Sequence, residues 1–272
     1  MIDLDAYLAR IGYDGPREPT LATLRALHGL HPARIPFEAV DVLLDRGVSL
    51  VPEAVDAKLI HAGRGGYCFE QNDLFRRALT ALGFAVEGLI ARVQWMRAPD
   101  DPPVPRSHMA LRVTIDGQRW LADVGFGGCV MTAPIRFDCA DAQPTPHEPY
   151  RLTDLGDEVR LDVQLPGGWA AAYDLSKAVQ READYEPANW FNATHPASIF
   201  RKVLLVSMAT PQARYMLTNN HLTIRRRDLE PERHVLGVDD LGHALETYFR
   251  LPVEAAWRPV LERAVAAGAH GV

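Results

Sequence analysis

One cysteine of the chain has neighbours that suit a nucleophile. Cys68 comes shortly after Gly65 and Gly66, and it precedes apolar residues at helical spacing, namely Leu74, Phe75, Ala78, Leu79 and Leu82. This spacing predicts a helix that begins at Cys68, where free backbone N–H groups and the positive end of the helix dipole stabilise an anion. The two glycines are expected to form a tight turn and to leave space for a substrate. We therefore expect a thiolate nucleophile in an open position.

A cysteine nucleophile requires a base, and the clearest hairpin of the sequence carries a candidate. Residues 109–115 and 118–123 alternate between apolar and polar side chains around Asp116-Gly117, a dipeptide typical of two-residue hairpin turns. The side chains of one face are expected to point toward a core: Met109, Leu111, Val113, Trp120 and Val124.

The register of this hairpin brings two ionisable residues together. If the turn contains only two residues, Ala110 faces Asp123, and His108 lies on the same face, diagonal to Asp123. An imidazole takes up the thiol proton, and a carboxylate fixes the imidazole tautomer and stabilises its positive charge. These residues predict a catalytic triad of Cys68, His108 and Asp123, in that chain order.

Other chemistries find little support in the sequence. The histidines show no HExxH spacing and no accompanying CxxC pair, so we expect no metal site. The glycine-rich stretch 125–128 departs from the dinucleotide-binding pattern, because Val130 stands where the third glycine should be. Cys129 and Cys139 are expected to be structural, and a total of 3 cysteines does not indicate a disulfide framework.

Length and charge limit the class of protein and its partners. A chain of 272 residues is long enough for one large domain or two to three small ones. The formal net charge of -6 argues against a nucleic-acid partner, and the basic run 225–227 is too short to change that. The acidic N-terminus and the lack of a membrane-length apolar run predict a cytoplasmic protein, in which thiols stay reduced.

The periodicity predicts an α+β chain. Helices are expected at 4–11, 21–30, 53–61 and 68–82, and Gly83 is expected to cap the last of them. From residue 84 a period of two predicts strands at 84–93, 109–115, 118–123, 150–155, 158–165, 169–175, 201–208, 213–218 and 221–226. We expect a proline-rich loop over 97–106, a long excursion over 182–197, and closing helices near 238–249 and 254–267.

Three segments, in this order, resemble the arylamine N-acetyltransferases. They are RGGYCFEQN at 64–72, SHM at 107–109 and WLADVGFG at 120–127. IPFE at 35–38 and PASIF at 196–200 also resemble segments of that family, so the similarity extends over nearly the whole length. Ala39 departs from the pattern, since the family usually has asparagine after Pro-Phe-Glu.

The resemblance implies both a fold and a reaction. It implies an N-terminal helical bundle over 1–83, a central antiparallel β-barrel-like domain over 84–185 and a C-terminal α/β lid over 186–272, around a Cys-His-Asp core similar to that of cysteine proteases. It also implies ping-pong transfer of an acetyl group from acetyl-CoA to arylamines, arylhydroxylamines or hydrazines, without a metal. The acetyl group would pass through a thioester on Cys68.

The same resemblance assigns further side chains. Positions that line the acceptor pocket of the family are matched by Phe37, Phe126 and Phe200. Positions near the cofactor in some bacterial relatives are matched by Trp95, Ser107 and Gly127.

Three other interpretations stay open from the sequence. An amide synthase that uses a longer acyl thioester would share these residues and differ in the size of its acceptor pocket. A cysteine hydrolase of the transglutaminase or papain type would share the order of Cys, His and Asp, although we expect no signal or pro-segment. A non-catalytic binding module would carry a cysteine with ordinary alkylation reactivity.

Overall fold

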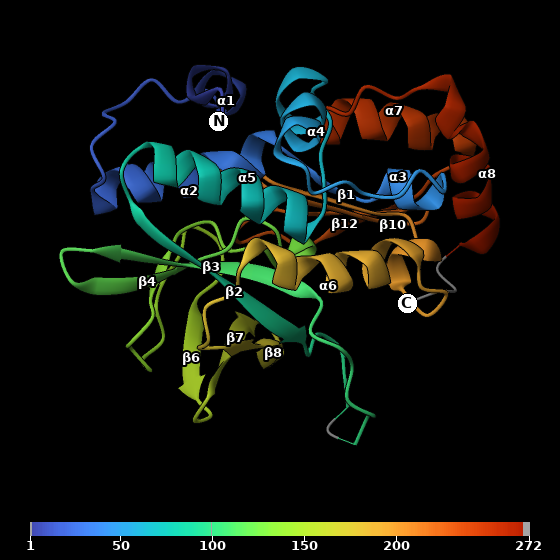
Figure 1. Cartoon of the computed structure of the whole chain (residues 1–272). Helices are drawn as coiled ribbons and strands as arrows, with labels where there is room; N and C mark the ends of the chain where they lie inside the picture. Colours follow the sequence, from blue (N-terminus) through green and yellow to red (C-terminus); the bar gives the residue numbers. More distant parts are fainter. Residues whose placement is uncertain (1, 99, 269–272) are drawn as a thin grey trace.

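Most helices lie on one side of the larger of two sheets (Figure 1). The computed structural model describes residues 2–98 and 100–268. Its helices are α1 (Leu4–Ile11), α2 (Leu21–Arg34), α3 (Val40–Leu43), α4 (Pro52–Asp56), α5 (Cys68–Ala81), α6 (Glu182–Thr194), α7 (Val238–Phe249) and α8 (Arg258–Ala267). No helix in the described part of the chain has the length and apolar character needed to cross a bilayer.

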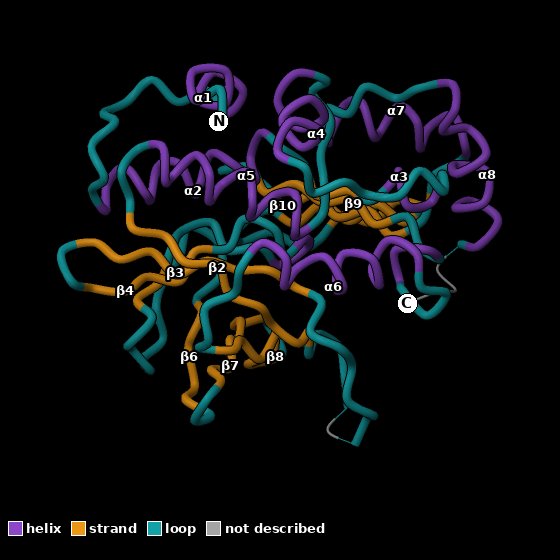
Figure 2. Tube along the Cα trace, viewed as in Figure 1, coloured by secondary structure: helices purple, strands orange, loops and turns teal. Residues whose placement is uncertain are grey.

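Both sheets are antiparallel. The larger one is barrel-like and orders its strands β5-β4-β3-β2-β8-β7-β6. These strands are β2 (Ala85–Val93), β3 (His108–Ile115), β4 (Gln118–Ala122), β5 (Ile135–Arg136), β6 (Tyr150–Asp154), β7 (Glu158–Leu165) and β8 (Gly168–Ser176). The smaller sheet, behind α3 in Figure 2, has the order β1-β9-β10-β11-β12. It consists of β1 (Phe37–Glu38), β9 (Leu205–Ala209), β10 (Arg214–Thr218), β11 (His221–Arg225) and β12 (Glu232–Val235).

The predicted hairpin and its register are confirmed. β3 and β4 pair with Leu111 opposite Ala122. The turn residues Asp116 and Gly117 both have positive φ angles, 49° and 74°, which is the conformation that a two-residue type I′ turn needs. Because this register is fixed locally, the positions of His108 and Asp123 follow from the turn.

Side chains of β3 alternate between two hydrophobic cores. The five side chains expected on the core face of the hairpin all lie in one core, together with apolar residues of α1, α2 and α5. Ala110 points the other way, into the core inside the barrel. A third core packs α7 and α8 on the smaller sheet and includes Val40 of α3. Each fully buried aliphatic side chain contributes roughly 1.5–3 kcal/mol, so these cores hold the hairpin and α5 together.

Some expected elements are wrong in kind or position. Most of the excursion over 182–197 is the helix α6, which begins where Arg181 N–H donates to the Asp184 carboxylate at 2.6 Å. Its interior Pro187 and its many weak helix formers hide it from a periodicity test.

Other boundaries move without changing the order of elements. The strand expected at 201–208 begins only at Leu205, after a 3-10 turn at Ile199–Arg201, and β12 was not expected. The last helix begins at Arg258 rather than at 254, after a 3-10 turn at Ala255–Trp257. The helix expected over 53–61 changes from α4 to a π-helical turn at Ala57–His61. In the loop expected over 97–106, Pro99 lies outside the described residues.

Candidate active site

Cys68 is the first residue of α5, as the sequence predicts. The N-cap residue Tyr67 donates its N–H to the Glu70 carboxylate at 3.0 Å, which closes the start of the helix. The thiol is not in an open position, because Cys68 is only 3% exposed and its Sγ lies 3.6 Å from the carbonyl oxygen of Ser107. The expectation of an exposed thiolate is therefore wrong, and a substrate must reach a buried sulfur.

The glycines around Cys68 make room for protein atoms rather than for a substrate. A Cβ atom on Gly65 would lie 2.1 Å from the carbonyl oxygen of Pro36, and one on Gly66 would lie 2.8 Å from the Glu70 carboxylate. Gly125 approaches Cys68 itself, since a Cβ atom there would lie 2.9 Å from the Cys68 Cα. The glycine pair thus permits close packing around the segment that leads to Cys68, which corrects the expectation of free space for a substrate.

Buried ion pairs fix the segment that precedes Cys68. Arg64 donates to both the Glu38 carboxylate, at 2.8 and 3.0 Å, and the Asp41 carboxylate, at 3.2 and 3.4 Å. Lys58 pairs with Asp41 at 2.9 Å and with Glu70 at 2.8 Å. Breaking a buried pair leaves an uncompensated charge at a cost of roughly 3–5 kcal/mol. The cluster therefore holds the start of α5 in one position.

Ala39, which departs from the family pattern, occupies the N-cap position of α3 without a capping side chain. The Glu38 carboxylate takes over this role, because its Oε2 accepts the N–H of Val40 at 2.7 Å. The N-terminus of α3 is therefore capped by the Glu38 carboxylate without a capping side chain at position 39.

His108 and Asp123 form a buried pair beside the thiol. His108 Nε2 lies 2.7 Å from Asp123 Oδ2, and the two side chains are 3% and 1% exposed. Burial alone would lower the pKa of His108, but the Asp123 carboxylate outweighs it and, with a hydrogen bond to Cys68, raises this pKa to about 10. Burial likewise raises the pKa of Asp123, whereas His108 and further hydrogen bonds lower it below its ordinary value. Imidazolium and carboxylate are thus the stable forms near neutral pH.

Three more groups hold the Asp123 carboxylate. Its Oδ1 accepts the side-chain amide of Asn72 at 2.9 Å and the N–H of Gly125 at 2.9 Å. Its Oδ2 accepts the hydroxyl of Tyr173 at 3.0 Å, in addition to the bond with His108. Asn72 and Tyr173 were not among the site residues predicted from the sequence. The position of Asn72 could have been predicted, because a residue four positions after Cys68 lies on the same face of the expected helix.

Two further buried side chains hold the backbone of the site. His28 Nε2 accepts the N–H of Asp123 at 3.0 Å, so its neutral form is required there. Burial lowers the pKa of His28 to about 4, which favours that form. From α6, Asn192 donates to the carbonyl oxygen of Ser107 at 2.9 Å, the same oxygen that lies near Cys68 Sγ. Neither His28 nor Asn192 was predicted from the sequence.

The aromatic residues assigned by resemblance gather in two groups. The ring of Phe126 lies 5.1 Å from the ring of His108 and 6.3 Å from that of Trp95. The rings of Phe37 and Phe200 lie 6.0 Å apart, and Gly127, with φ of 77°, lies against Phe37. Of the six residues assigned to acceptor and cofactor, Phe126 contacts His108, Trp95 contacts Phe126, and the carbonyl oxygen of Ser107 lies 3.6 Å from Cys68 Sγ, whereas Phe37, Phe200 and Gly127 form the other group.

Metal ligands do not gather at this site. Within residues 2–98 and 100–268, no group of three or more His, Cys, Asp or Glu side chains is arranged to hold a metal ion.

Comparison with known proteins gives first a class and then a family. A family profile described as N-acetyltransferase matches residues 20–258, which makes the protein an acyltransferase. The arylamine N-acetyltransferase of Mycolicibacterium smegmatis is 44% identical over 228 residues, which are 83% of this chain and 83% of the relative. That of Escherichia coli (strain K12) is 40% identical over 257 residues, which are 88% of this chain and 91% of the relative.

Solved structures agree with these sequences. The structure of M. smegmatis arylamine N-acetyltransferase has a TM-score of 0.92 at 40% identity and covers 98% of both chains. That of the Mycobacterium marinum enzyme in complex with CoA has a TM-score of 0.92 at 36% identity, over 97% of this chain and 99% of the other. The chain therefore belongs to the arylamine N-acetyltransferase family. This membership favours a transferase over the hydrolase and the binding module.

Proposed function

We propose that this acyltransferase moves an acetyl group from acetyl-CoA to arylamines, arylhydroxylamines or hydrazines by a ping-pong reaction through Cys68. The observation that carries the proposal is the buried pair of His108 and Asp123, 2.7 Å apart, next to a cysteine at a helix start. Such a pair supplies the base and the orienting carboxylate that a thiol nucleophile needs. The CoA complex of the M. marinum relative supports CoA thioesters as donors.

In the first half-reaction the Cys68 thiolate attacks the thioester carbonyl of acetyl-CoA. The free backbone N–H groups at the start of α5 are the natural donors to the oxyanion that forms. When the tetrahedral intermediate collapses, the bond to the CoA sulfur breaks, and the imidazolium of His108 gives its proton to that sulfur. The products are free CoA, acetyl-Cys68 and a neutral His108.

In the second half-reaction the acceptor amine attacks the acetyl carbonyl. Neutral His108 takes the proton from the attacking nitrogen, while Cys68 leaves as a thiolate. Asp123 keeps the imidazole oriented in both steps, since its Oδ2 holds His108 Nε2 and leaves the other ring nitrogen to face the reacting atoms. The first half-reaction exchanges one thioester for another, and the second exchanges the thioester on Cys68 for the amide of the acetylated amine, so no further co-reactant is required.

The surrounding residues take supporting parts in the proposal. The acceptor ring would lie against Phe37, Phe126 and Phe200, whose aromatic surfaces suit an arylamine. Trp95, Ser107 and Gly127 would contact the pantetheine arm of the donor. We also propose a division into a helical domain over 1–83, a barrel domain over 84–185 and an α/β lid over 186–272. The cytoplasm is the proposed location, because it keeps the catalytic thiol reduced.

Intact-mass spectrometry after brief exposure to acetyl-CoA without acceptor tests the proposal. We expect one added acetyl group on the wild-type protein, none on Cys68→Ala, and loss of the group when an aminobenzoate is added. Cys129→Ala is the matched control, because Cys129 is also buried but lies outside the proposed triad. Absence of acetylation would overturn the proposal, and a longer acyl thioester that does label Cys68 would favour the amide synthase.

A further inference from the structure

One backbone oxygen beside the thiol competes with His108 for the thiol proton. Cys68 Sγ lies 3.6 Å from the carbonyl oxygen of Ser107, a contact in which a thiol can donate its proton. The thiol also forms a hydrogen bond with His108. A carbonyl oxygen stabilises a neutral thiol by accepting its proton and repels a thiolate. The Ser107 carbonyl therefore opposes the proton transfer to His108 on which the proposed mechanism depends.

Asn192 of α6 engages this same carbonyl. Its Nδ2 donates to the Ser107 oxygen at 2.9 Å, and the residue is only 3% exposed. A carbonyl oxygen has two lone pairs, and the amide takes up one of them. The positive end of the amide dipole also offsets part of the negative potential that the carbonyl directs at the sulfur. Asn192 is held in turn, because its own carbonyl oxygen accepts the hydroxyl of the buried Ser198 at 2.7 Å.

A second asparagine of α6 anchors the helix at a different point. Asn189 lies three residues before Asn192, on the same face of the helix. It accepts the hydroxyl of Tyr67 and donates to the carbonyl oxygen of Val48 at 2.9 Å. Tyr67 directly precedes the nucleophile, so both asparagines attach α6 to the site. They differ in that the partner of Asn192 is the oxygen next to the thiol.

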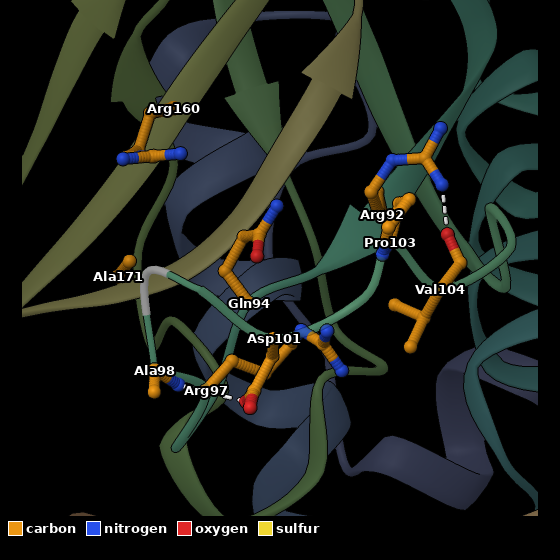
Figure 3. A pocket seen from close by; sticks show the side chains of 9 residues that line it. All are labelled: Arg92, Gln94, Arg97, Ala98, Asp101, Pro103, Val104, Arg160 and Ala171. Atoms are coloured by element: carbon orange, nitrogen blue, oxygen red, sulfur yellow. Dashed lines mark hydrogen bonds between the residues drawn. The ribbon is translucent and has the colours of Figure 1, made fainter.

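The backbone that leads to Ser107 has little support from the barrel. A cavity of about 430 Å³ lies between the loop over 97–106 and the strands β2, β7 and β8 (Figure 3). Arg92 and Arg160 line it on the side of the sheet. The orientation of the Ser107 peptide group therefore depends on hydrogen bonds. These are the bond from its N–H to the carbonyl oxygen of Ala91 at 3.0 Å and the bond that its oxygen accepts from Asn192.

We propose that Asn192 is a positioning residue of the transfer reaction, whose amide engages the Ser107 carbonyl and so directs the thiol proton of Cys68 to His108. This inference rests on the proposed function, in which Cys68 is the nucleophile and His108 is the base. In the step concerned, one proton moves from Cys68 Sγ to the imidazole, and Asn192 keeps both of its amide protons. A helix that carries no member of the triad thus takes part in forming the nucleophile.

Alkylation of Cys68 by iodoacetamide tests the proposal without any acyl donor. Asn192→Leu removes the donor and keeps a side chain of similar size, which leaves little room for a water molecule. Near neutral pH we expect Cys68 to react about threefold to tenfold more slowly, which is the effect of one hydrogen bond. The ultraviolet absorbance of the thiolate, taken as the difference from Cys68→Ala, should fall in parallel. Unchanged reactivity and absorbance would overturn the proposal.

Asn189→Leu is the matched control. Asn189 also anchors α6, and in the described part of the chain it has no hydrogen bond with Ser107. Thermal unfolding should show a comparable loss of stability for both variants, whereas alkylation in Asn189→Leu should stay within about twofold of the wild-type rate. Equal slowing in both variants would overturn the proposal, because α6 would then act only as a support.

Two further comparisons complete the test. Asn192→Ala also lacks the donor and should slow alkylation as Asn192→Leu does; slowing by leucine alone would be steric and would overturn the proposal. The result is separable from the proposed function, because alkylation needs no acetyl-CoA. If acetyl-CoA fails to label Cys68, the proposed function fails, and slower alkylation of both Asn192 variants still supports the role of Asn192 at the thiol.

Discussion

Replacement of Asp123 by asparagine probes the core of the proposed mechanism. Asp123 Oδ1 accepts from the Asn72 amide and from the Gly125 N–H, both at 2.9 Å. In the variant the single side-chain oxygen is needed at this point, so the new NH2 group takes the place of Oδ2. There it faces His108 Nε2, which lay 2.7 Å from the carboxylate, and the hydroxyl of Tyr173.

This exchange reverses the tautomer of the imidazole. Nε2 of His108 must now accept a hydrogen bond, so the proton of the neutral ring moves to the nitrogen that faces Cys68. The ring then has no lone pair for the thiol proton, and it also loses the carboxylate that raises its pKa to about 10. Without this carboxylate, burial lowers the pKa of His108 below its ordinary 6.5, so the imidazolium is no longer the stable form near neutral pH. We expect acetylation of Cys68 to slow by roughly 10³–10⁴-fold.

Rapid-quench mass spectrometry of Cys68 acetylation measures this effect. Tyr173→Phe is the matched control, because it removes a hydrogen bond to the same oxygen but keeps the charge of Asp123, and we expect at most a tenfold loss. Alkylation by iodoacetamide at pH 6 gives a second readout, which should fall at least tenfold in Asp123→Asn as the imidazolium disappears. A folded Asp123→Asn protein that acetylates within tenfold of the wild-type rate would refute the reasoning.

Two further predictions concern stability. Gly125→Ala should lower the free energy of unfolding by roughly 1–3 kcal/mol, because the added Cβ would lie 2.7 Å from Asn72 Nδ2. Gly167→Ala is the control, since a Cβ there has nothing within 4 Å, and it should change the free energy of unfolding by less than about 0.5 kcal/mol. Thermal unfolding of both variants measures the difference. Burial lowers the pKa of His31 to about 3, below its ordinary 6.5, so its stabilising contribution is complete above pH 6.5 and falls by about 2 kcal/mol by pH 5. The free energy of unfolding is measured with urea above pH 6.5 and at pH 5, and it should fall less between these conditions for His31→Gln than for the wild-type protein. An equal fall in both proteins would contradict the lowered pKa of His31.

Local signals predicted the elements that carry the candidate triad. The dipeptide Asp116-Gly117 fixed the hairpin register through a requirement on two φ angles, and this register does not depend on the rest of the fold. The apolar spacing after Cys68 likewise fixed the start of α5. By contrast, α6 contains Pro187 and weak helix formers, and it is stabilised by tertiary contacts such as the hydrogen bond from the Tyr67 hydroxyl to Asn189. Such contacts are not visible in a local pattern.

The features of the site that were not predicted depend on contacts between residues far apart in the sequence. Tyr173 reaches Asp123 because β8 lies beside β2 in the sheet, although the two residues are 50 positions apart in the chain. The burial of Cys68 was not predicted for the same reason, because Ser107 and Gly125 approach this residue only in the folded chain. The sequence thus predicts that Cys68, His108 and Asp123 lie on neighbouring elements better than it predicts how these residues are enclosed.

One side chain explains why groups from a helix and a hairpin meet with such precision. Asn72 donates to the carbonyl oxygen of Met109 at 2.7 Å and to Asp123 at 2.9 Å, and its own oxygen accepts the Val124 N–H at 3.1 Å. These contacts join α5 to β3 and to the residues that follow β4, and the four-residue spacing places Cys68 one helical turn from Asn72. A shift of α5 by one residue would break all three hydrogen bonds inside a buried site. Sequence spacing on the helix and register in the hairpin are therefore coupled through this amide.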